Sequence, residues 1–397
     1  MKNKSALALI FLTVFIDLLG FGILIPILPS FSVKVLKIDE TEIGITIAIY
    51  SLIQMLFNPI LGKYSDKHGR KPVIVVCLLI NAIGYLVFSF THSYLMLIIS
   101  RVIAGIGGSS IAVAQAYIAD VTTKDNRSKG MGLIGSAFGL GFVFGPLIGG
   151  LLSNYGYAVT GFVAAGFSLI AFTLTIIYLP ESLNSKENAE ISKPSQGRKL
   201  LDIEGMKRIL KKPDLALLIM LFFILTFSFA NIYGTFALLG LKVYGFTDMQ
   251  NGYMYGITGI TQAIIQGGLI GRINKLFSKR KILTSGLFMM TIALAMVPYG
   301  QTFLGLAIVS IVLSFGNGIF QPTILSLISE VSSEAEQGIT LGLNQSLSAF
   351  ARVLGPLWGG FAFEYLGYPF PFLTGSVFIF FIFLLTTFYL PKKIKLD

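Results

Sequence analysis

Residues 141–150 read GFVFGPLIGG, and residues 351–360 read ARVLGPLWGG. The two stretches lie 210 positions apart and share a Gly-Pro-Leu and a Gly-Gly at the same spacing. Because a structural repeat leaves this kind of internal sequence symmetry, the match predicts two related halves. Three further pairs of stretches stand at nearly the same separation: Asp120-Val121 with Glu330-Val331, Tyr178-Leu179-Pro180 with Tyr389-Leu390-Pro391, and Leu61-Gly62-Lys63 with Ile270-Gly271-Arg272.

The composition indicates a protein of the lipid bilayer. Hydrophobic residues make up 54% of the 397 residues, charged residues make up 12%, and the mean hydropathy is +0.79. Soluble domains carry about twice that share of charged residues, roughly 25%. The first apolar run lacks the preceding charged region and the small-residue cleavage site of a signal peptide. We therefore expect this run to be retained as a helix.

Twelve apolar runs are long enough to cross a bilayer as helices, which takes about 20 residues. We expect an all-α integral membrane fold in which twelve transmembrane helices form two six-helix bundles. The predicted organisation is an N-terminal bundle over 1–180, a cytoplasmic central loop over 181–213 and a C-terminal bundle over 214–397. The predicted spans are 6–29, 42–62, 72–90, 94–118, 130–153, 157–179, 214–240, 249–271, 280–299, 302–328, 338–363 and 368–390.

Basic residues gather in alternate connections between these spans. Membrane proteins keep Lys and Arg in their cytoplasmic loops, so the pattern predicts that both termini lie in the cytoplasm. The formal net charge of +11 is then explained by the basic residues of the cytoplasmic loops. We therefore do not expect nucleic acid as a partner. The basic set comprises Lys2, Lys4, Lys63, Lys67, Arg70, Lys71, Lys124, Arg127, Lys129, eight Lys and Arg residues from Lys186 to Lys212, Arg272, Lys275, Lys279, Arg280, Lys281, Lys392, Lys393 and Lys395, whereas the opposite set holds only Lys34, Lys37 and Lys242.

The end of the central loop has an amphipathic pattern. Ile203, Met206 and Leu210 fall on one helical face and are surrounded by basic residues. This arrangement suits a short helix that lies on the inner leaflet. A solvated linker is the alternative.

Few residues of the chain could support enzymatic or metal chemistry. The single cysteine, Cys77, lies in an apolar run and cannot form an internal disulfide. With only His68 and His92 beside it, we expect no metal cluster. The sequence also lacks a Ser–His pair with a plausible Asp and a phosphate-binding glycine loop, so we do not expect an enzyme.

Four motifs in different parts of the chain carry a resemblance to a known family. Residues 62–71 read GKYSDKHGRK, and span four holds Arg101 followed by Gly105. Span five carries Gly141-x-x-x-Gly145-Pro146-x-x-Gly149-Gly150, and span one carries Asp17-x-x-Gly20-x-Gly22 before Pro26 and Pro29. In this combination the chain resembles the major facilitator superfamily, and in particular its twelve-span drug–proton antiporters of the tetracycline and multidrug efflux type.

The resemblance implies a function and an energy source. It implies a carrier that exports small amphiphilic or apolar compounds, such as drugs or toxic metabolites, in exchange for protons by alternating access. The expected partners are the small-molecule substrate, protons and membrane lipids. We expect the protein to lie in the bacterial plasma membrane and to be functional as a monomer. We expect no cofactor, because the proton gradient is the energy source.

Three alternatives to multidrug export remain. A proton-driven nutrient uptake carrier is disfavoured because the span-five glycine motif is largely absent from uptake carriers. Tetracycline-specific efflux is disfavoured because those exporters carry an acidic residue in span three beside a Tyr-Leu pair, where this chain has Gly84 before Tyr85 and Leu86. A non-transporting membrane protein with this fold would tolerate the loss of Asp17 and Arg101.

Asp17 is the acidic residue that the predicted spans place deep in the membrane. A carboxyl group in a low-dielectric site can hold a proton near neutral pH. Ionisable groups at such depth are functional candidates by default. We predict that Asp17 carries the coupling proton and that Arg101 pairs with it and promotes proton release. The alternative is a permanently paired Asp17 that orders the helices.

The glycines of span five predict close helix packing. Gly141, Gly145 and Gly149 recur every four residues on one face, so a neighbouring helix can approach closely. Pro146 removes a backbone donor and Gly150 adds a further small residue. A bendable helix between the halves would seal one side of a cavity and slide. Ordinary packing without motion is the alternative.

The connection after span two predicts a cytoplasmic latch. Gly62, Asp66, Gly69, Arg70 and Asp120 are expected to cluster there and to favour one closed face of the carrier. The alternative is that the charged residues of this connection are solvated and only determine the orientation of the chain in the membrane. The corresponding positions of the second half are Lys275, Lys279 and Glu330.

Polar side chains at helical spacing predict a substrate cavity between the spans. The many aromatic side chains and few charges suit an apolar or weakly polar ligand. Helix packing is the alternative for each of these residues, and Arg352 could also snorkel. The predicted cavity residues are Tyr50, Gln54, Asn58, Asn231, Tyr255, Gln262, Asn317, Gln321, Gln345 and Arg352.

Overall fold

The computed structural model describes residues 2–122, 124–183, 203–333 and 336–390, and it describes only the backbone of residues 2–5, 124–129, 203 and 338. Within these ranges the chain is helical and has no strand. Ten of its helical stretches are long and apolar enough to cross a membrane. The predicted all-α membrane fold is therefore confirmed, and the protein is a multi-pass membrane protein.

The chain divides into two compact units. The first unit comprises Met1–Lys37 and Ile49–Leu201, and the second comprises Ile38–Ala48 and Asp202–Asp397. Residues 38–48, which the sequence places in the N-terminal bundle, thus group with the second unit. Much of the predicted central loop, together with its basic residues from Lys186 to Lys199, lies outside the described residues, as do Lys392, Lys393 and Lys395.

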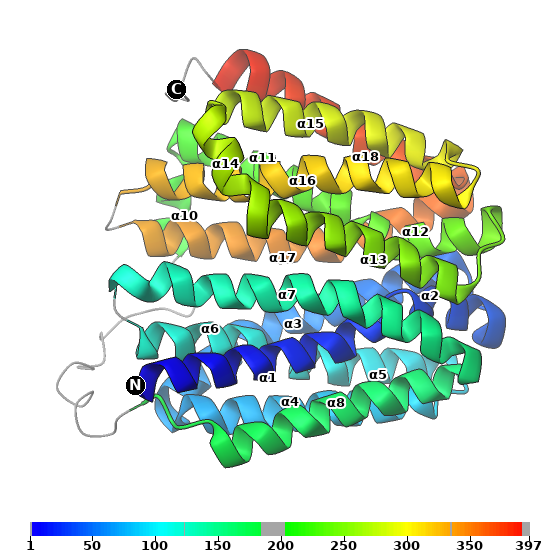
Figure 1. Cartoon of the computed structure of the whole chain (residues 1–397), viewed down its shortest axis with the longest axis horizontal. Coiled ribbons are helices and arrows are strands. Elements are labelled where there is room, and N and C mark those ends of the chain that lie inside the picture. Colours follow the sequence, from blue (N-terminus) through cyan, green and yellow to red (C-terminus); the bar gives the residue numbers. More distant parts are fainter. Residues whose placement is uncertain (1, 123, 184–202, 334–335, 391–397) are drawn as a thin grey trace. The chain divides into compact units, whose positions relative to one another are not determined.

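The first unit is a bundle in which α1 lies along α7 and α8, while α4 packs against α5 and α8 (Figure 1). Its core joins apolar side chains such as Ile10, Leu78, Tyr117 and Ala171, which are all fully buried. The elements are α1 (Lys2–Leu24), α2 (Ile27–Phe31), η1 (Ser32–Leu36), α3 (Glu40–His68, whose first residues belong to the second unit), α4 (Arg70–Ser89), α5 (Tyr94–Gly107), α6 (Ser110–Val121), α7 (Lys124–Leu152), η2 (Ser153–Tyr155) and α8 (Tyr157–Tyr178).

In the second unit α15 packs against α16 and α18, while α11 packs against α17 and α18. Short π-helical turns extend or interrupt several of these helices. The elements are α10 (Ile203–Leu210), α11 (Pro213–Ala230), α12 (Ile232–Leu238), η3 (Leu239–Val243), α13 (Asp248–Ile264), η4 (Ile265–Leu269), α14 (Ile270–Leu276), α15 (Lys279–Met296), η5 (Val297–Tyr299), α16 (Phe303–Val331), α17 (Gln337–Phe361), η6 (Ala362–Leu366), α18 (Phe370–Leu384) and η7 (Leu385–Tyr389).

Two predicted spans fall outside the ten apolar stretches, although both are helical. The span predicted at 249–271 is divided into α13, η4 and α14, and π-helical turns of this kind are frequent at functional sites. The span predicted at 338–363 corresponds to α17, which is one helix but carries polar residues such as Asn344 and Arg352. Both are thus more irregular or more polar than an ordinary membrane helix.

Breaks in the first-unit helices leave backbone groups that need partners in an apolar medium. The stretch predicted at 94–118 is broken because α5 ends at Gly107 and α6 begins at Ser110. The carbonyl oxygen of Gly108, which lies in this break, accepts a hydrogen bond of 2.9 Å from the side-chain amide of Gln54. A polar side chain on α3 therefore stabilises the break.

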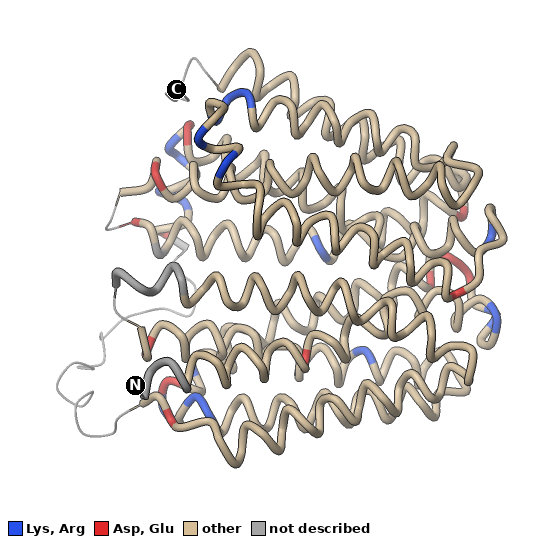
Figure 2. Tube along the Cα trace, viewed as in Figure 1, with Lys and Arg blue, Asp and Glu red and all other residues tan. Residues whose placement is uncertain are grey.

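Charged residues gather at the ends of the helices, and few lie along their middles (Figure 2). We call the end of each unit that carries the connection 62–71 or 272–281 its basic end. The short helix predicted at the end of the central loop is present as α10. Leu210 is exposed, as a residue that faces lipid would be, while Ile209 is buried and packs with Leu215 and Leu343. This helix therefore docks on α11 and α17 through Ile209.

Candidate functional site

Asp17 lies in the middle of α1 and is almost completely buried, with 4% of its surface exposed. Its carboxylate accepts one hydrogen bond at each oxygen. The side-chain amide of Asn81 on α4 donates to Oδ1, and the hydroxyl of Ser110 at the start of α6 donates to Oδ2, both over 2.8 Å. Asp17 is therefore a buried acid that is held by two neutral donors, an arrangement that suits a group that gains and loses a proton.

The predicted pairing of Asp17 with Arg101 is not found in the structure. Arg101 on α5 is 3% exposed, and its Nε donates to the hydroxyl of Ser100 over 3.2 Å. Its guanidinium carbon lies 5.5 Å from the centroid of the Phe88 ring, within the range of a cation–π contact. One guanidinium nitrogen, Nη2, has no hydrogen-bond partner among the described residues. Ser110, which follows the break after Gly107, donates to the carboxylate instead.

The span-five glycines allow α7 to approach α1, which belongs to the same unit. A Cβ on Gly141 would lie 2.8 Å from the Cβ of Leu18, and a Cβ on Gly145 would lie 2.6 Å from the Cα of Gly22. At Gly149 the nearest atom, the backbone oxygen of Ile23, would be only 2.2 Å away. Close packing is thus confirmed. The helix that approaches this face of α7 is α1 of the same unit. The sequence instead predicted that this face of α7 lies at the interface between the two halves.

The second half repeats this packing with its own helices. A Cβ on Gly355 of α17 would lie 2.7 Å from the Cβ of Ala230 at the end of α11, and a Cβ on Gly359 would lie 2.6 Å from the backbone oxygen of Asn231. The 210-residue repeat in the sequence therefore corresponds to one recurring contact in each unit. In both units a glycine-rich helix packs against the first helix of its half.

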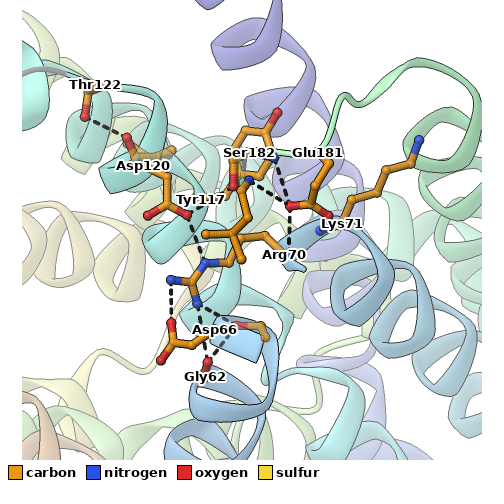
Figure 3. A network of polar contacts seen from close by, with 12 residues as sticks. Gly62, Asp66, Arg70, Lys71, Tyr117, Asp120, Thr122, Glu181 and Ser182 are labelled. Atoms are coloured by element: carbon orange, nitrogen blue, oxygen red, sulfur yellow. Dashed lines mark hydrogen bonds and ion pairs between the residues drawn. The ribbon is translucent and has the colours of Figure 1, made fainter. Parts of the chain in front are cut away.

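The predicted latch residues come together at the basic end of the first unit (Figure 3). Arg70 begins α4, and its guanidinium forms ion pairs with Asp66 over 2.5 Å and with Asp120 over 2.9 Å. Its Nη1 also donates to the Ser65 hydroxyl over 2.7 Å and to the Gly62 carbonyl over 3.3 Å. The Arg70 side chain is 9% exposed and Asp120 is 24% exposed, so this pair is partly shielded from water, whereas Asp66 is 58% exposed. One cation thus joins the ends of α3, α4 and α6.

Glu181 is part of this network, although no pattern in the sequence predicted it. Its carboxylate accepts hydrogen bonds from the backbone N–H groups of Arg70 and Lys71, over 2.9 and 3.1 Å, at the start of α4. A carboxylate there satisfies free donors and interacts favourably with the helix dipole. Gly69, which precedes the helix with a φ of +101°, leaves room for Glu181, since a Cβ there would lie 2.5 Å from its Oε2. Glu181 therefore caps α4 from a distant part of the chain.

Removal of the Glu181 carboxylate tests this cap. We expect Glu181→Ala to lower the free energy of unfolding by about 1–2 kcal/mol, the usual cost of a lost N-terminal cap. Ser182→Ala is the matched control, because it removes only a 3.0 Å hydrogen bond to Asp120. Thermal unfolding in detergent compares the two, and an equal effect of both variants would contradict the capping role.

The second unit carries a smaller counterpart at its basic end. Lys279, which begins α15, forms an ion pair with Glu330 near the end of α16. The Glu330 carboxylate also accepts a hydrogen bond from the hydroxyl of Ser326 over 2.8 Å. Both partners of the ion pair are substantially exposed, so this pair contributes little to stability. The sequence predicted that Lys279 and Glu330 correspond to Arg70 and Asp120. The structure shows that each of these two pairs of residues forms an ion pair.

Residues 38–48 are fixed to the second unit at the end opposite its basic end. Glu40 forms an ion pair with Lys242 of η3, and the backbone N–H of Thr41 donates to Glu364 of η6 over 3.0 Å. A Cβ on Gly44 would lie 2.3 Å from the backbone oxygen of Pro356. These polar contacts and the close glycine packing explain why the start of α3 groups with the second unit.

The predicted cavity residues have different environments. Asn231 is fully buried and donates its amide to the Pro371 carbonyl, so it fits helix packing. The Tyr255 hydroxyl donates to the Tyr233 carbonyl over 2.7 Å. Tyr50 stacks on Phe21 with ring centroids 5.0 Å apart, and Gln54 caps the break at Gly108. The remaining residues range from buried (Asn317) through half-buried (Asn58, Gln262, Gln321, Arg352) to exposed (Gln345).

Comparisons with known proteins agree with this architecture. The model of the Major Facilitator Superfamily matches residues 10–277 and 267–396. Multidrug resistance protein 1 of Bacillus subtilis (strain 168) is 30% identical over 375 residues, which cover 94% of each chain. Tetracycline resistance protein, class B, of Escherichia coli is 27% identical over 362 residues, or 90% of this chain and 88% of that protein.

Solved structures show the same fold. The human organic anion transporter MFSD10 (TETRAN) superposes with a TM-score of 0.72 at 23% identity, over 97% of this chain and all of that chain (100%). The nucleoside transporter NupG superposes with a TM-score of 0.76 at 16% identity, over 97% of this chain and 99% of the other. With a family model that covers nearly the whole chain, the resemblance inferred from the motifs is confirmed: this protein belongs to the Major Facilitator Superfamily.

Proposed function

We propose that this protein is a proton-coupled antiporter of the bacterial plasma membrane that exports small amphiphilic or apolar compounds. The observation that carries the proposal is the buried carboxylate of Asp17, which is held by two neutral donors and forms no ion pair within the described residues. A carboxylate in this setting can be neutralised by a proton without breaking a salt bridge. Its relatives in the multidrug and tetracycline resistance group support the direction and the substrate class.

In this proposal the other sites support alternating access. The Arg70 network favours one closed face at the basic end, which we place in the cytoplasm together with both termini. Arg101 is a buried cation on the same bundle, and its positive charge would act on Asp17 through space without a direct bond. Aromatic and amide side chains such as Tyr50, Tyr255 and Gln262 would contact the substrate. One chain holds both halves and would act as a monomer, without a cofactor.

Transport by inverted membrane vesicles tests the proposal. With an acidic interior, the vesicles are expected to accumulate a fluorescent amphiphilic dye or a lipophilic cation. A protonophore should abolish the accumulation, and vesicles without the protein serve as the control. Accumulation that is unchanged by the protonophore would contradict proton coupling. Net flux of the dye out of the inverted vesicles would indicate that the protein is an uptake carrier.

Gly84 argues against tetracycline as the principal substrate. A Cβ at this position of α4 would lie 2.9 Å from the backbone nitrogen of Ala104 on α5, so no side chain fits without separating the two helices. We expect Gly84→Asp to lower the free energy of unfolding by about 1–3 kcal/mol and to confer no tetracycline export. Gly166→Asp is the control for the introduced charge, because a Cβ at Gly166 meets no atom within 4 Å. A stable Gly84→Asp variant with tetracycline resistance would contradict this reasoning.

A further inference from the structure

The two oxygens of Asp17 are bound by chemically different donors. Oδ1 accepts from the amide Nδ2 of Asn81, and Oδ2 accepts from the hydroxyl of Ser110. Asn81 is 2% exposed and Ser110 is 4% exposed, so water does not compete for these bonds. An amide nitrogen can only donate a hydrogen bond, whereas a hydroxyl can donate or accept. The two oxygens are therefore not equivalent as sites for a proton.

A proton on Oδ1 would weaken the hydrogen bond from the Asn81 amide, because a protonated carboxyl oxygen is a poorer acceptor than a carboxylate oxygen. A rotated Asn81 amide does not solve this conflict. Its own Oδ1 lies against Gly107, where a Cβ would be only 2.4 Å away, and this oxygen has no hydrogen-bond partner among the described residues. Rotation would place two N–H donors in this tight contact, and buried donors without partners are costly.

We propose that the exchangeable proton occupies Oδ2 of Asp17 and that Ser110 is the positioning residue that reverses its hydrogen bond to receive it. The inference rests on the proposed function, in which Asp17 carries the coupling proton. On protonation an O–H bond forms at Oδ2 and donates to the Ser110 hydroxyl oxygen, and the negative charge of the carboxylate is neutralised. The Ser110 hydrogen turns away from Oδ2 in the same step.

Other titratable groups near Asp17 come from α4 and α5. The Asp17 charge acts on the Cys77 thiol and the Tyr85 hydroxyl of α4, and Arg101 of α5 acts in turn on Tyr85. None of the three forms a hydrogen bond to the carboxylate within the described residues. The faces of α7 and α8 that pack on α1 near this point present Gly141, Gly145, Ala164 and Ser168. Ser110 is thus the neighbour of Asp17 that can exchange donor and acceptor roles at Oδ2.

Infrared difference spectra between acid and alkaline pH test the assignment. In the protonated carboxyl, the C=O stretch reports on Oδ1 and the deuterium-sensitive C–O–H mode reports on Oδ2. We expect Asn81→Ala to move the C=O stretch to higher frequency, because the carbonyl loses its donor. Ser110→Ala should instead move the C–O–H mode. The reverse pattern, equal effects of both variants on both modes, or no effect of either would overturn the proposal.

Transport provides the second readout. We expect Ser110→Ala to shift the pH of half-maximal efflux upward by about one unit, since the charged carboxylate loses a stronger hydrogen bond than the neutral form does. Ser110→Thr, which keeps the hydroxyl, should restore the original profile. Ser168→Ala is the matched control, because Ser168 is fully buried beside α1 and its hydroxyl has no partner among the described residues.

The outcomes separate this inference from the proposed function. If Asp17→Asn keeps both the carboxyl band and proton-driven transport, the proposed function fails. If Asp17→Asn loses both but Ser110→Ala has the wild-type pH profile, Asp17 carries the proton and the role of Ser110 is overturned. A Ser168→Ala variant with the same shift as Ser110→Ala would also overturn it, because the shift would then reflect general packing.

Discussion

Gly149→Ala is expected to destabilise the first unit more than Gly141→Ala or Gly145→Ala. The added Cβ would lie 2.2 Å from the backbone oxygen of Ile23 and 3.0 Å from its carbonyl carbon. Backbone atoms of α1 cannot rotate away as a flexible side chain would, so the two helices must separate. Overpacking in a dense core costs typically about 1–3 kcal/mol, and a backbone clash places this variant at or above the upper end. Loss of monodisperse protein and a lowered midpoint of thermal unfolding would report the effect.

Gly139→Ala is the control on the same helix. A Cβ there meets no atom within 4 Å, so only the helical propensity changes. Alanine is favoured over glycine in helices by about 0.5–1 kcal/mol, and this variant should be as stable as the wild type or more stable. If Gly149→Ala were equally stable, the close contact of α7 with α1 would not be a feature of the folded protein.

The fold could be predicted from the sequence because the bilayer imposes simple requirements on the chain. A span needs about 20 apolar residues, and the runs of such residues show directly in the sequence. The repeated Gly-Pro-Leu and Gly-Gly predicted two halves, and each copy indeed marks a helix that packs closely on the first helix of its half. The sequence could not show that residues 38–48 group with the second unit, because the Glu40–Lys242 pair joins residues about 200 positions apart.

The site was only partly predictable. Asp17 was found because an acid within an apolar run is rare, and Arg70 with Asp66 and Asp120 was found from the motif. Asn81 and Ser110 were missed because uncharged polar residues are common in membrane helices and carry little signal. The predicted Asp17–Arg101 pair rested on charge alone, whereas the carboxylate is bound by the neutral side chains of Asn81 and Ser110. Glu181 was missed because capping from a distant segment leaves no local pattern.

Asp17→Asn is expected to abolish proton-driven transport without unfolding the protein. The asparagine has nearly the same shape as the aspartic acid, and its amide can occupy the same position in α1. Its oxygen can still accept from Asn81, and its nitrogen can donate to the Ser110 hydroxyl, as the protonated acid would. The variant therefore resembles a carrier that is permanently protonated, and a buried charge no longer has to be desolvated. We expect its unfolding free energy to differ from that of the wild type by no more than about 1 kcal/mol.

Two measurements in one preparation decide this prediction. Thermal unfolding in detergent should show an intact Asp17→Asn protein, while accumulation of dye in acid-loaded inverted vesicles should fall to the level of vesicles without the protein. Asp66→Asn is the matched control, because it also removes one carboxylate from the first unit, but at an exposed position on the basic end. It should leave the dependence on the proton gradient in place even if the rate changes. Because the carboxylate of Asp17 is buried and forms no ion pair within the described residues, gradient-dependent transport by Asp17→Asn would mean that the coupling proton binds elsewhere.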